Sequence, residues 1–296
     1  MVNINGIGKS IERSGSLVKK NELTEEEINK LEIDILLFAI YRISGYDFRQ
    51  YARSSVKRRI MHRMRLESLP SISALTEKVI HEPDFLEVVL NDLSINVTEM
   101  FRDPSFFLAF REKVVPHLKT YPEIRIWHAG CSSGEEAYSM AILLEEEGLY
   151  NRTRIYATDM NARVLRQAEA GAFSLNKMQT YTKNYFQAGG KREFSQYYTT
   201  DSVNAYFHPS LTENMVFAQH NLVTDSSFNE FHVIICRNVM IYFNHDLQKK
   251  VFHLFDESLS SRGFLGLGHK ETLRTMDTEG KYILFSREEK IYQKKG

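Results

Sequence analysis

The chain has 296 residues, 43% of them apolar, so it is long enough to bury a sizeable core and to form two domains. Lysine plus arginine equal aspartate plus glutamate at 38 each, which excludes the strong overall field of a nucleic-acid-binding or membrane-surface protein. No N-terminal signal peptide and no apolar run of about 20 residues is present, so we expect a cytoplasmic, soluble protein.

The N-terminal third has helical patterning. Residues 1–30 contain several glycines and serines with little apolar periodicity, which predicts a flexible lead. Thr24 followed by three glutamates predicts an N-capped helix start, and further helices are expected over 48–66, 73–80 and 83–93. The sequence therefore predicts a small all-helical domain over residues 31–95.

A different pattern follows residue 110. Short β-branched and aromatic runs alternate with helical stretches, which predicts βαβ units and a parallel sheet; the runs are 124–129, 154–158, 216–219, 232–236 and 264–267. Two later runs, 282–286 and 290–293, predict a closing antiparallel hairpin. The segment 173–208 does not fit one crossover helix, so a second domain is expected over 96–296 with an insert, partly β-hairpin, at about 172–215.

The two cysteines, Cys131 and Cys236, lie far apart and each within an apolar run. Free cysteines in such runs are usually buried and reduced in cytosolic proteins. We expect two buried thiols here, although the sequence alone leaves a disulfide open.

The strongest local signal is IRIWHAGCSSGEEAYS over residues 124–139. A strand, a loop with Gly130 and Gly134, and a helix beginning near Glu135 form the arrangement that binds a nucleotide beyond the first strand of an α/β sheet. Glu135 and Glu136 would repel a pyrophosphate but suit a cationic amine or sulfonium, which favours S-adenosylmethionine over NAD. The alternative is that the two acids only stabilise the helix N-terminus.

Two further motifs follow later strands. Asp159, directly after an apolar strand, is placed to accept the ribose hydroxyls, although it could instead cap a helix starting at Asn161. The QHNL motif, which contains Asn221 and Leu222, could bind the adenine edge, but loop amides more often serve turns.

The last two motifs contain polar residues, one after a later strand of the second domain and one at the start of that domain. Arg237 and Asn238 end a buried strand, and Tyr242 follows on a helix or loop, so all three are expected at the ligand crevice. In NVTEMFR, Thr98 and Arg102 are four residues apart and would share a face of a helical turn. A helix-capping box in an interdomain linker is the alternative for that segment.

The chain resembles the CheR-type chemotaxis receptor methyltransferases from about residue 32 to the C-terminus. The motifs that carry the resemblance, by their order and spacing, are NVTEMFR, AGCSSGEEAYS, ATDMN, QHNL and CRNVMIYF. The resemblance implies an α/β fold, with a Rossmann-like S-adenosylmethionine methyltransferase sheet that carries a small inserted β-subdomain and follows an all-α N-terminal domain. It also implies that glutamate carboxylates of chemoreceptors are methylated and that S-adenosylhomocysteine is the product.

The resemblance assigns roles residue by residue. The implied cofactor-binding positions are Asn96, Thr98, Arg102, Gly130, Glu135, Glu136, Asp159, Asn221, Leu222, Arg237 and Asn238. Which of the two adjacent glutamates makes the main contact stays open. Arg102 and Tyr242 match the positions that face the substrate carboxylate, and no metal is expected.

Partner recognition has a separate signal in the basic stretch 49–65, which contains no acid. Spacings of four residues place part of its arginines and lysines on one helix face, which could simply be solvated. The resemblance implies that this face contacts an acidic helical receptor surface, through Arg53, Lys57, Arg59 and Arg63. We expect a monomer with no nucleic-acid partner and no membrane insertion.

Three departures from the family pattern are Met100, Lys270 and a divergent insert, so docking of a receptor tail peptide on the insert stays open. Two other functions remain in view. One is an RNA or small-molecule methyltransferase, which the neutral total charge disfavours. The other is a regulatory module that binds S-adenosylmethionine or its product in another signalling system.

Overall fold

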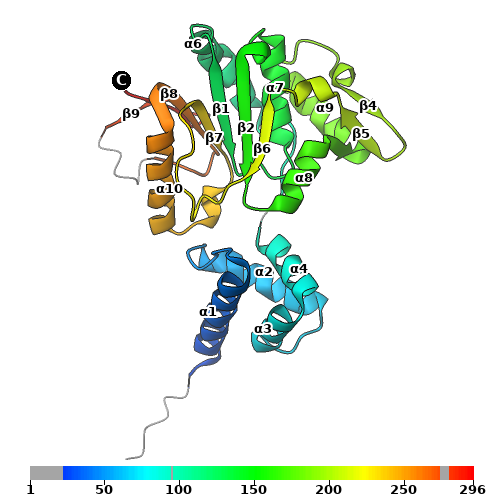
Figure 1. Ribbon diagram of the computed structural model, residues 1–296, viewed down its shortest axis with the longest axis vertical. Helices are drawn as coiled ribbons and strands as arrows, with labels where there is room; N and C mark the ends of the chain where they lie inside the picture. The colour runs from blue at the N-terminus through cyan, green and yellow to red at the C-terminus, as the bar shows by residue number, and fades with distance from the viewer. Residues whose placement is uncertain (1–22, 95, 274–279) are drawn as a thin grey trace, which may run out of the picture.

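A computed structural model describes residues 23–94, 96–273 and 280–296, which form a helical domain and an α/β domain (Figure 1). The helical domain consists of α1 (Glu25–Ser44), α2 (Arg53–Leu66), α3 (Ile72–His81) and α4 (Pro83–Leu93). The predicted cap of α1 is confirmed, because the Thr24 hydroxyl accepts from the Glu27 amide and the Glu27 carboxylate accepts from the Thr24 amide.

The predicted start of α2 near residue 48 was wrong. Gly45 ends α1 in the left-handed conformation, and the following segment runs as an irregular connection up to Arg53. Its backbone is used in contacts with the other domain: Tyr51 forms a bridge with Phe243, and the Ala52 amide donates to the carbonyl of Tyr242 over 2.7 Å. Those bonds replace the ones that a helix would make.

The α/β domain is built on a seven-stranded sheet in the order β6-β2-β1-β7-β8-β10-β9. Neighbours from β6 to β8 are parallel and β10 is antiparallel to both β8 and β9, which confirms the predicted parallel sheet and closing hairpin. The strands are β1 (Ile124–Ala129), β2 (Thr153–Asp159), β6 (Met215–Gln219), β7 (Phe231–Cys236), β8 (Leu259–Leu267), β9 (Tyr282–Ser286) and β10 (Ile291–Lys294).

Both faces of the sheet are covered by helices. Successive residues of β1 point to opposite faces, so Ile126 joins one hydrophobic cluster and Trp127 joins another. The first cluster includes side chains of α5 (Pro104–Ala109), α6 (Val115–Leu118) and α7 (Glu135–Glu146); the second includes side chains of α10 (His245–Ser258). Cys131 and Cys236 are both free and buried, as predicted.

The insert after α8 (Ala162–Ala170) forms its own small sheet, as the sequence predicted. Strands β3 (Ala172–Ser174), β4 (Tyr198–Thr200) and β5 (Asn204–Phe207) pair antiparallel in the order β3-β5-β4, with α9 (Met178–Gln187) between β3 and β4. The hydroxyls of Tyr185 and Tyr197 both donate to Glu146 of α7 and so tie the insert to the main domain.

The helical domain lies against the end of the sheet at which the parallel strands finish (Figure 1). The side-chain amide of Asn161 donates to the side-chain oxygen of Asn91 in α4 over 2.9 Å. The side-chain amide of Gln219 donates to the Tyr46 hydroxyl over 3.0 Å. The space between the domains is therefore bordered by strand ends on one side and by helices on the other. Among the described residues, no helix is both long enough and apolar enough to cross a bilayer.

Candidate functional site

A groove lies where the parallel strands meet the helical domain. One half is lined by Gly130 after β1, Asp159 at the end of β2, Asn221 and Leu222 after β6, and Tyr242 after β7, with Asn96 from the linker. The other half is lined by Thr98, Arg102, Glu136 and Arg237, and both halves share Gly130, Asn238 and Val239. The structure thus brings together all the predicted cofactor-binding and acceptor-binding residues except Glu135.

The floor of the groove depends on Gly130. Its φ of 80° lies in the left-handed region, and a Cβ built there would lie 2.6 Å from Cγ2 of Val239. The amides of Gly130 and Cys131 both donate to the Thr158 carbonyl over 2.8 Å, which fixes the β1–α7 loop beside the end of β2. A side chain at residue 130 would push apart two loops that line the groove.

Asp159 is buried at the end of β2, with 8% of its surface exposed. Its carboxylate accepts from the amides of Ser132 and Asn161, both over 2.9 Å, and burial raises its pKa above the usual value. The N-cap of α8 is Asn161, whose side chain accepts from the Arg163 amide, so the alternative reading of Asp159 as the helix cap was wrong.

The two adjacent glutamates have separate environments. Glu135 points away from the groove, since its carboxylate accepts from the hydroxyls of Ser133 and Tyr181 and lies 3.6 Å from Lys177. Glu136 lines the groove and lies 3.0 Å from Nδ1 of His128. Burial opposes its ionisation, but the bonds from His128 and Arg237 lower its pKa below the usual range. Of these two glutamates, Glu136 is the one that can present a negative charge to a ligand in the groove.

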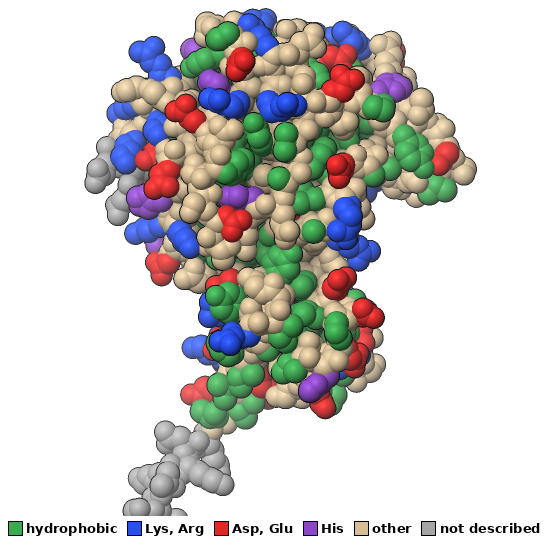
Figure 2. Space-filling view, in the orientation of Figure 1, with side chains coloured by type: hydrophobic (Ala, Val, Ile, Leu, Met, Phe, Trp, Pro, Cys, Tyr) green, Lys and Arg blue, Asp and Glu red, His purple; other side chains and the backbone are tan. Residues whose placement is uncertain are grey.

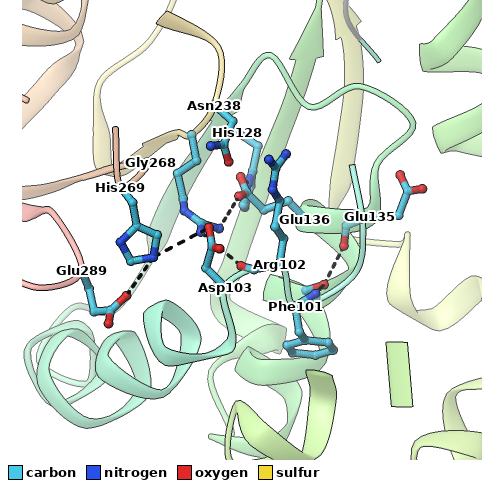
Figure 3. A network of polar contacts seen from close by, with 12 residues as sticks. Phe101, Arg102, Asp103, His128, Glu135, Glu136, Asn238, Gly268, His269 and Glu289 are labelled. Carbon is cyan, nitrogen blue, oxygen red and sulfur yellow. Dashed lines mark hydrogen bonds and ion pairs between the residues drawn. The ribbon is translucent and has the colours of Figure 1, made fainter. Parts of the chain in front are cut away.

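Arg237 is buried and pairs with two carboxylates, those of Asp103 and Glu136, which Figure 3 labels. Its guanidinium lies 2.6 Å from the Asp103 carboxylate and 2.9 Å from that of Glu136, and donates to the Arg102 carbonyl over 3.1 Å. It also stacks 4.2 Å from the ring centre of Phe106. Arg237 thus joins three segments behind the groove and holds the Arg102 backbone in place.

Replacing Arg237 by alanine should lower the free energy of unfolding by about 3–5 kcal/mol, because Glu136 would be left buried without its cation. Chemical denaturation at neutral pH measures this. Arg154→Ala is the matched control, because Arg154 is an exposed residue whose guanidinium donates to the Glu213 carbonyl. Equal stability losses in the two variants would contradict the role given to the network.

The linker that carries Arg102 is not the helical turn that the sequence suggested. Phe101 and Asp103 both have left-handed φ angles, 50° and 54°, so Thr98 and Arg102 do not share a helix face. The Phe101 amide donates to the Ser139 hydroxyl over 2.8 Å, and its ring is fully buried. This anchor directs the neighbouring Arg102 into the groove beside Glu136 and Asn238 (Figure 3).

Glu271 is a site residue that the sequence reasoning missed. Its carboxylate accepts from five backbone amides: Gly268 at 2.6 Å, Asn238 at 3.1 Å, Val239 at 3.0 Å, Met240 at 2.9 Å and Ile241 at 3.3 Å. Burial raises its pKa even against these bonds. Its position four residues after β8, at the edge where the other strands end, was the available signal. Glu271 holds the loop that presents Asn238 and Tyr242.

The four predicted partner-binding residues all lie on α2, and two of them form ion pairs with acidic residues of the chain. Arg53 pairs with Asp34, and Arg63 pairs with Asp92 at 2.6 Å and Glu67 at 3.3 Å. Arg59 donates to the Asp92 carbonyl and its guanidinium lies 5.9 Å from the Tyr242 ring centre. Lys57 is exposed.

A basic cleft of about 440 Å³ adjoins the groove. Its basic residues come from α2, and it shares Ser94 and Asn96 with the groove; these basic residues are Arg58, Arg59, His62 and Arg65. Of these, Arg58, His62 and Arg65 were not among the predicted contacts, although the same basic stretch contains them.

Comparison with known proteins gives two family matches. Residues 96–288 match the model described as CheR methyltransferase, SAM binding domain, and residues 31–94 match CheR methyltransferase, all-alpha domain. A Pseudomonas putida protein provisionally named methyltransferase Cher3 is 48% identical over 92% of this chain and 100% of its own. Chemotaxis protein methyltransferases of Listeria monocytogenes and Salmonella typhimurium are 28% and 27% identical, over 83% and 81% of this chain and 92% and 83% of theirs.

Proposed function

We propose that this chain, which belongs to the CheR methyltransferase family, esterifies glutamate side chains on an acidic helical region of a chemoreceptor. It is an S-adenosylmethionine-dependent methyltransferase, and S-adenosylhomocysteine is the product that leaves its site. The observation that carries the finer proposal is the juxtaposition of the groove and the basic cleft, which share Ser94 and Asn96.

The groove contains polar atoms that are available to form hydrogen bonds with the cofactor. Among the described residues, Nδ1 of His220 and Oγ of Ser132 are buried without a hydrogen-bond partner, and both residues line the groove. Asp159 is an acceptor for ribose hydroxyls, and Glu136 is the anion suited to a cationic donor. These groups surround Gly130, where the missing side chain leaves room.

The chemistry requires alignment more than acid–base catalysis. A glutamate side chain has a pKa near 4.3, so at neutral pH the acceptor already carries the attacking charge and needs no general base. When bound, the donor would supply an activated methyl group on sulfur. The carbon–oxygen bond to the acceptor would form as the carbon–sulfur bond breaks, and the electron pair of the broken carbon–sulfur bond would stay on sulfur. Correct orientation alone can supply about 7–11 kcal/mol of the barrier.

Arg102 and Tyr242 are the residues we assign to the acceptor carboxylate. They line different halves of the groove, Arg102 from the linker and Tyr242 from the loop after β7. A guanidinium and a phenol both donate hydrogen bonds, so together they can hold the two acceptor oxygens. Tyr242 also lies near Arg59 of the cleft, which places the expected methyl-transfer position close to the bound partner.

The partner is expected to be acidic and helical. The cleft is lined by α2 cations, and Lys57 lies exposed on the same helix, so opposite charge on the partner would speed encounter. Arg53 and Arg63 are better assigned to fixing α2, since each is paired within the chain.

Donor affinity should fall at acid pH because of Asp159. Its folded-state pKa is raised by burial, and a ribose that donates hydrogen bonds favours the ionised carboxylate. Binding is therefore strong above that raised pKa and weakens as pH falls through it, beginning above the ordinary value of 3.8. The pKa of Glu136 is shifted the other way, below its usual value of 4.5.

Isothermal titration with S-adenosylhomocysteine across the acidic range tests this. Asp159→Asn should bind more weakly at neutral pH and lose the pH dependence. An unchanged pH profile in that variant would assign the titration to another group.

The function itself is tested with purified full-length protein, labelled S-adenosylmethionine and a helical receptor fragment. Label should enter the fragment as a base-labile ester, released as methanol, and should not enter a fragment whose acceptor glutamates are replaced by alanine. Combined Lys57→Ala, Arg58→Ala and Arg65→Ala substitution should raise the KM for the fragment and weaken its salt dependence. Label entering RNA instead, or donor binding without any transfer, would refute the proposal.

A further inference from the structure

Helix α1 has two apolar faces, and only one of them is covered. Ile33, Leu36, Leu37 and Ile40 face α3 and the core of the helical domain, with at most 2% of each side chain exposed. On the opposite side, Ile28, Leu31, Ile35 and Phe38 are 45%, 50%, 51% and 53% exposed. We call these four residues the α1 stripe.

The stripe has the spacing of a helix–helix seam. Its residues follow one another at intervals of three, four and three, which places them on one face over three turns. Isolated apolar residues on a surface are ordinary, but a continuous row of four large side chains at these intervals is the pattern that pairs with another helix. Hydrophobic side chains gather at the foot of the helical domain, where α1 lies (Figure 2).

The charges along α1 indicate what the partner helix is. The first turn is acidic, with Glu25, Glu26 and Glu27, and the last turn carries Arg42. Two copies of α1 placed antiparallel would set the acidic turn of each beside the basic end of the other. A parallel pair would set acid beside acid. The helix dipoles favour the same antiparallel arrangement.

We propose that the α1 stripe pairs with the α1 stripe of a second copy of this chain, antiparallel about a twofold axis near residues 31–35. In that arrangement Ile28 faces Phe38 of the second copy, and Leu31 faces its Ile35. Asp34 would approach Asp34 of the second copy, but each of these aspartates is already paired with Arg53 of its own chain. The same patch serves both copies, which is the rule for a twofold interface.

The pairing leaves the methyl-transfer groove accessible. The groove lies on the other side of the helical domain, between it and the sheet, and the start of α1 is the part of that domain farthest from the sheet (Figure 1). With one helix per subunit in contact, the interface is small, so the dimer is a weak one that forms with rising concentration. This differs from the monomer that the sequence suggested.

Sedimentation velocity of the full-length chain over a wide range of concentrations tests the pairing. The wild-type protein should shift towards the dimer as concentration rises. Ile35→Glu should weaken dimerisation by at least about tenfold, because twofold symmetry places the change in the interface twice. The matched control is Ile80→Glu, which changes an isoleucine of similar exposure, 48%, on α3 and should leave the equilibrium unchanged. Donor binding should be equal in all three proteins.

Orientation is tested by exchanging charges. Glu25→Lys and Arg42→Glu should each weaken the dimer roughly threefold, since each creates like-charge neighbours twice. The double variant restores opposite charges across an antiparallel pair and should recover wild-type dimerisation, whereas a parallel pair would gain nothing. A wild-type chain that stays monomeric at every concentration would overturn the proposal, as would stripe variants that dimerise normally.

Discussion

Replacing Arg102 by alanine should lower kcat for methyl transfer by about 100-fold or more while changing donor affinity by less than about tenfold. The guanidinium is placed by the buried Phe101 ring and by a bond to the Val97 carbonyl over 3.1 Å, so it points into the groove without being needed to build it. Its removal leaves the acceptor carboxylate poorly oriented, and misplacement by about 1 Å can cost 100-fold.

Turnover with a receptor fragment, and calorimetry with S-adenosylhomocysteine, separate the two effects. Arg102→Lys keeps the charge but not the two-pronged donor geometry and should recover only part of the rate. Arg125→Ala is the control and should behave as wild type, because Arg125 lies near the start of β1, at the end of the sheet opposite the groove. A large loss of donor affinity with normal turnover of bound donor would assign Arg102 to the cofactor instead.

Replacing Glu271 by glutamine should weaken donor binding by about tenfold and lower the free energy of unfolding by about 1–3 kcal/mol. A neutral amide presents an N–H group to some of the five backbone amides that the carboxylate now accepts. The loop with Asn238 and Tyr242 would then lose its fixed shape, although Glu271 itself does not line the groove. Calorimetry with S-adenosylhomocysteine and denaturant unfolding measure the two losses.

Glu146→Gln provides the matched control for this effect. Glu146 is also a buried carboxylate with several donors, but it ties the insert to α7 far from the groove. It should therefore lose stability and keep donor affinity. If both variants lost stability and both kept donor affinity, Glu271 would be a structural residue and not a positioning one.

The positions along the chain of the seven strands of the main sheet followed from local patterns. β1 was predicted at its observed bounds, and α4 likewise, because alternation, caps and a proline at the first turn mark such elements within a few residues. The gathering of Gly130, Asp159 and Asn238 also followed, because the carboxyl ends of parallel strands meet at one edge.

The errors fall where distant contacts decide local structure. The start of α2 is set by bonds from Tyr51 and Ala52 to the loop at Tyr242 and Phe243, about 190 residues away, which no local pattern contains. The turn at Phe101 is set by burial of its ring against other parts of the fold. Likewise, the different directions of Glu135 and Glu136 depend on Tyr181 of the insert and on Arg237, which directly follows β7.

The backbone bonds that join the two domains also connect the groove to the helix that we propose binds the partner. The Tyr242 carbonyl accepts from Ala52, and the Asn244 amide donates to the Gln50 carbonyl over 2.9 Å, so the loop beside the donor is bonded to the segment that leads into α2. A partner that shifts α2 must therefore shift this loop too. By thermodynamic linkage, whatever factor a bound receptor applies to donor affinity, the donor applies to receptor affinity in return. Loading with cofactor would then change the affinity of the chain for the receptor that we propose.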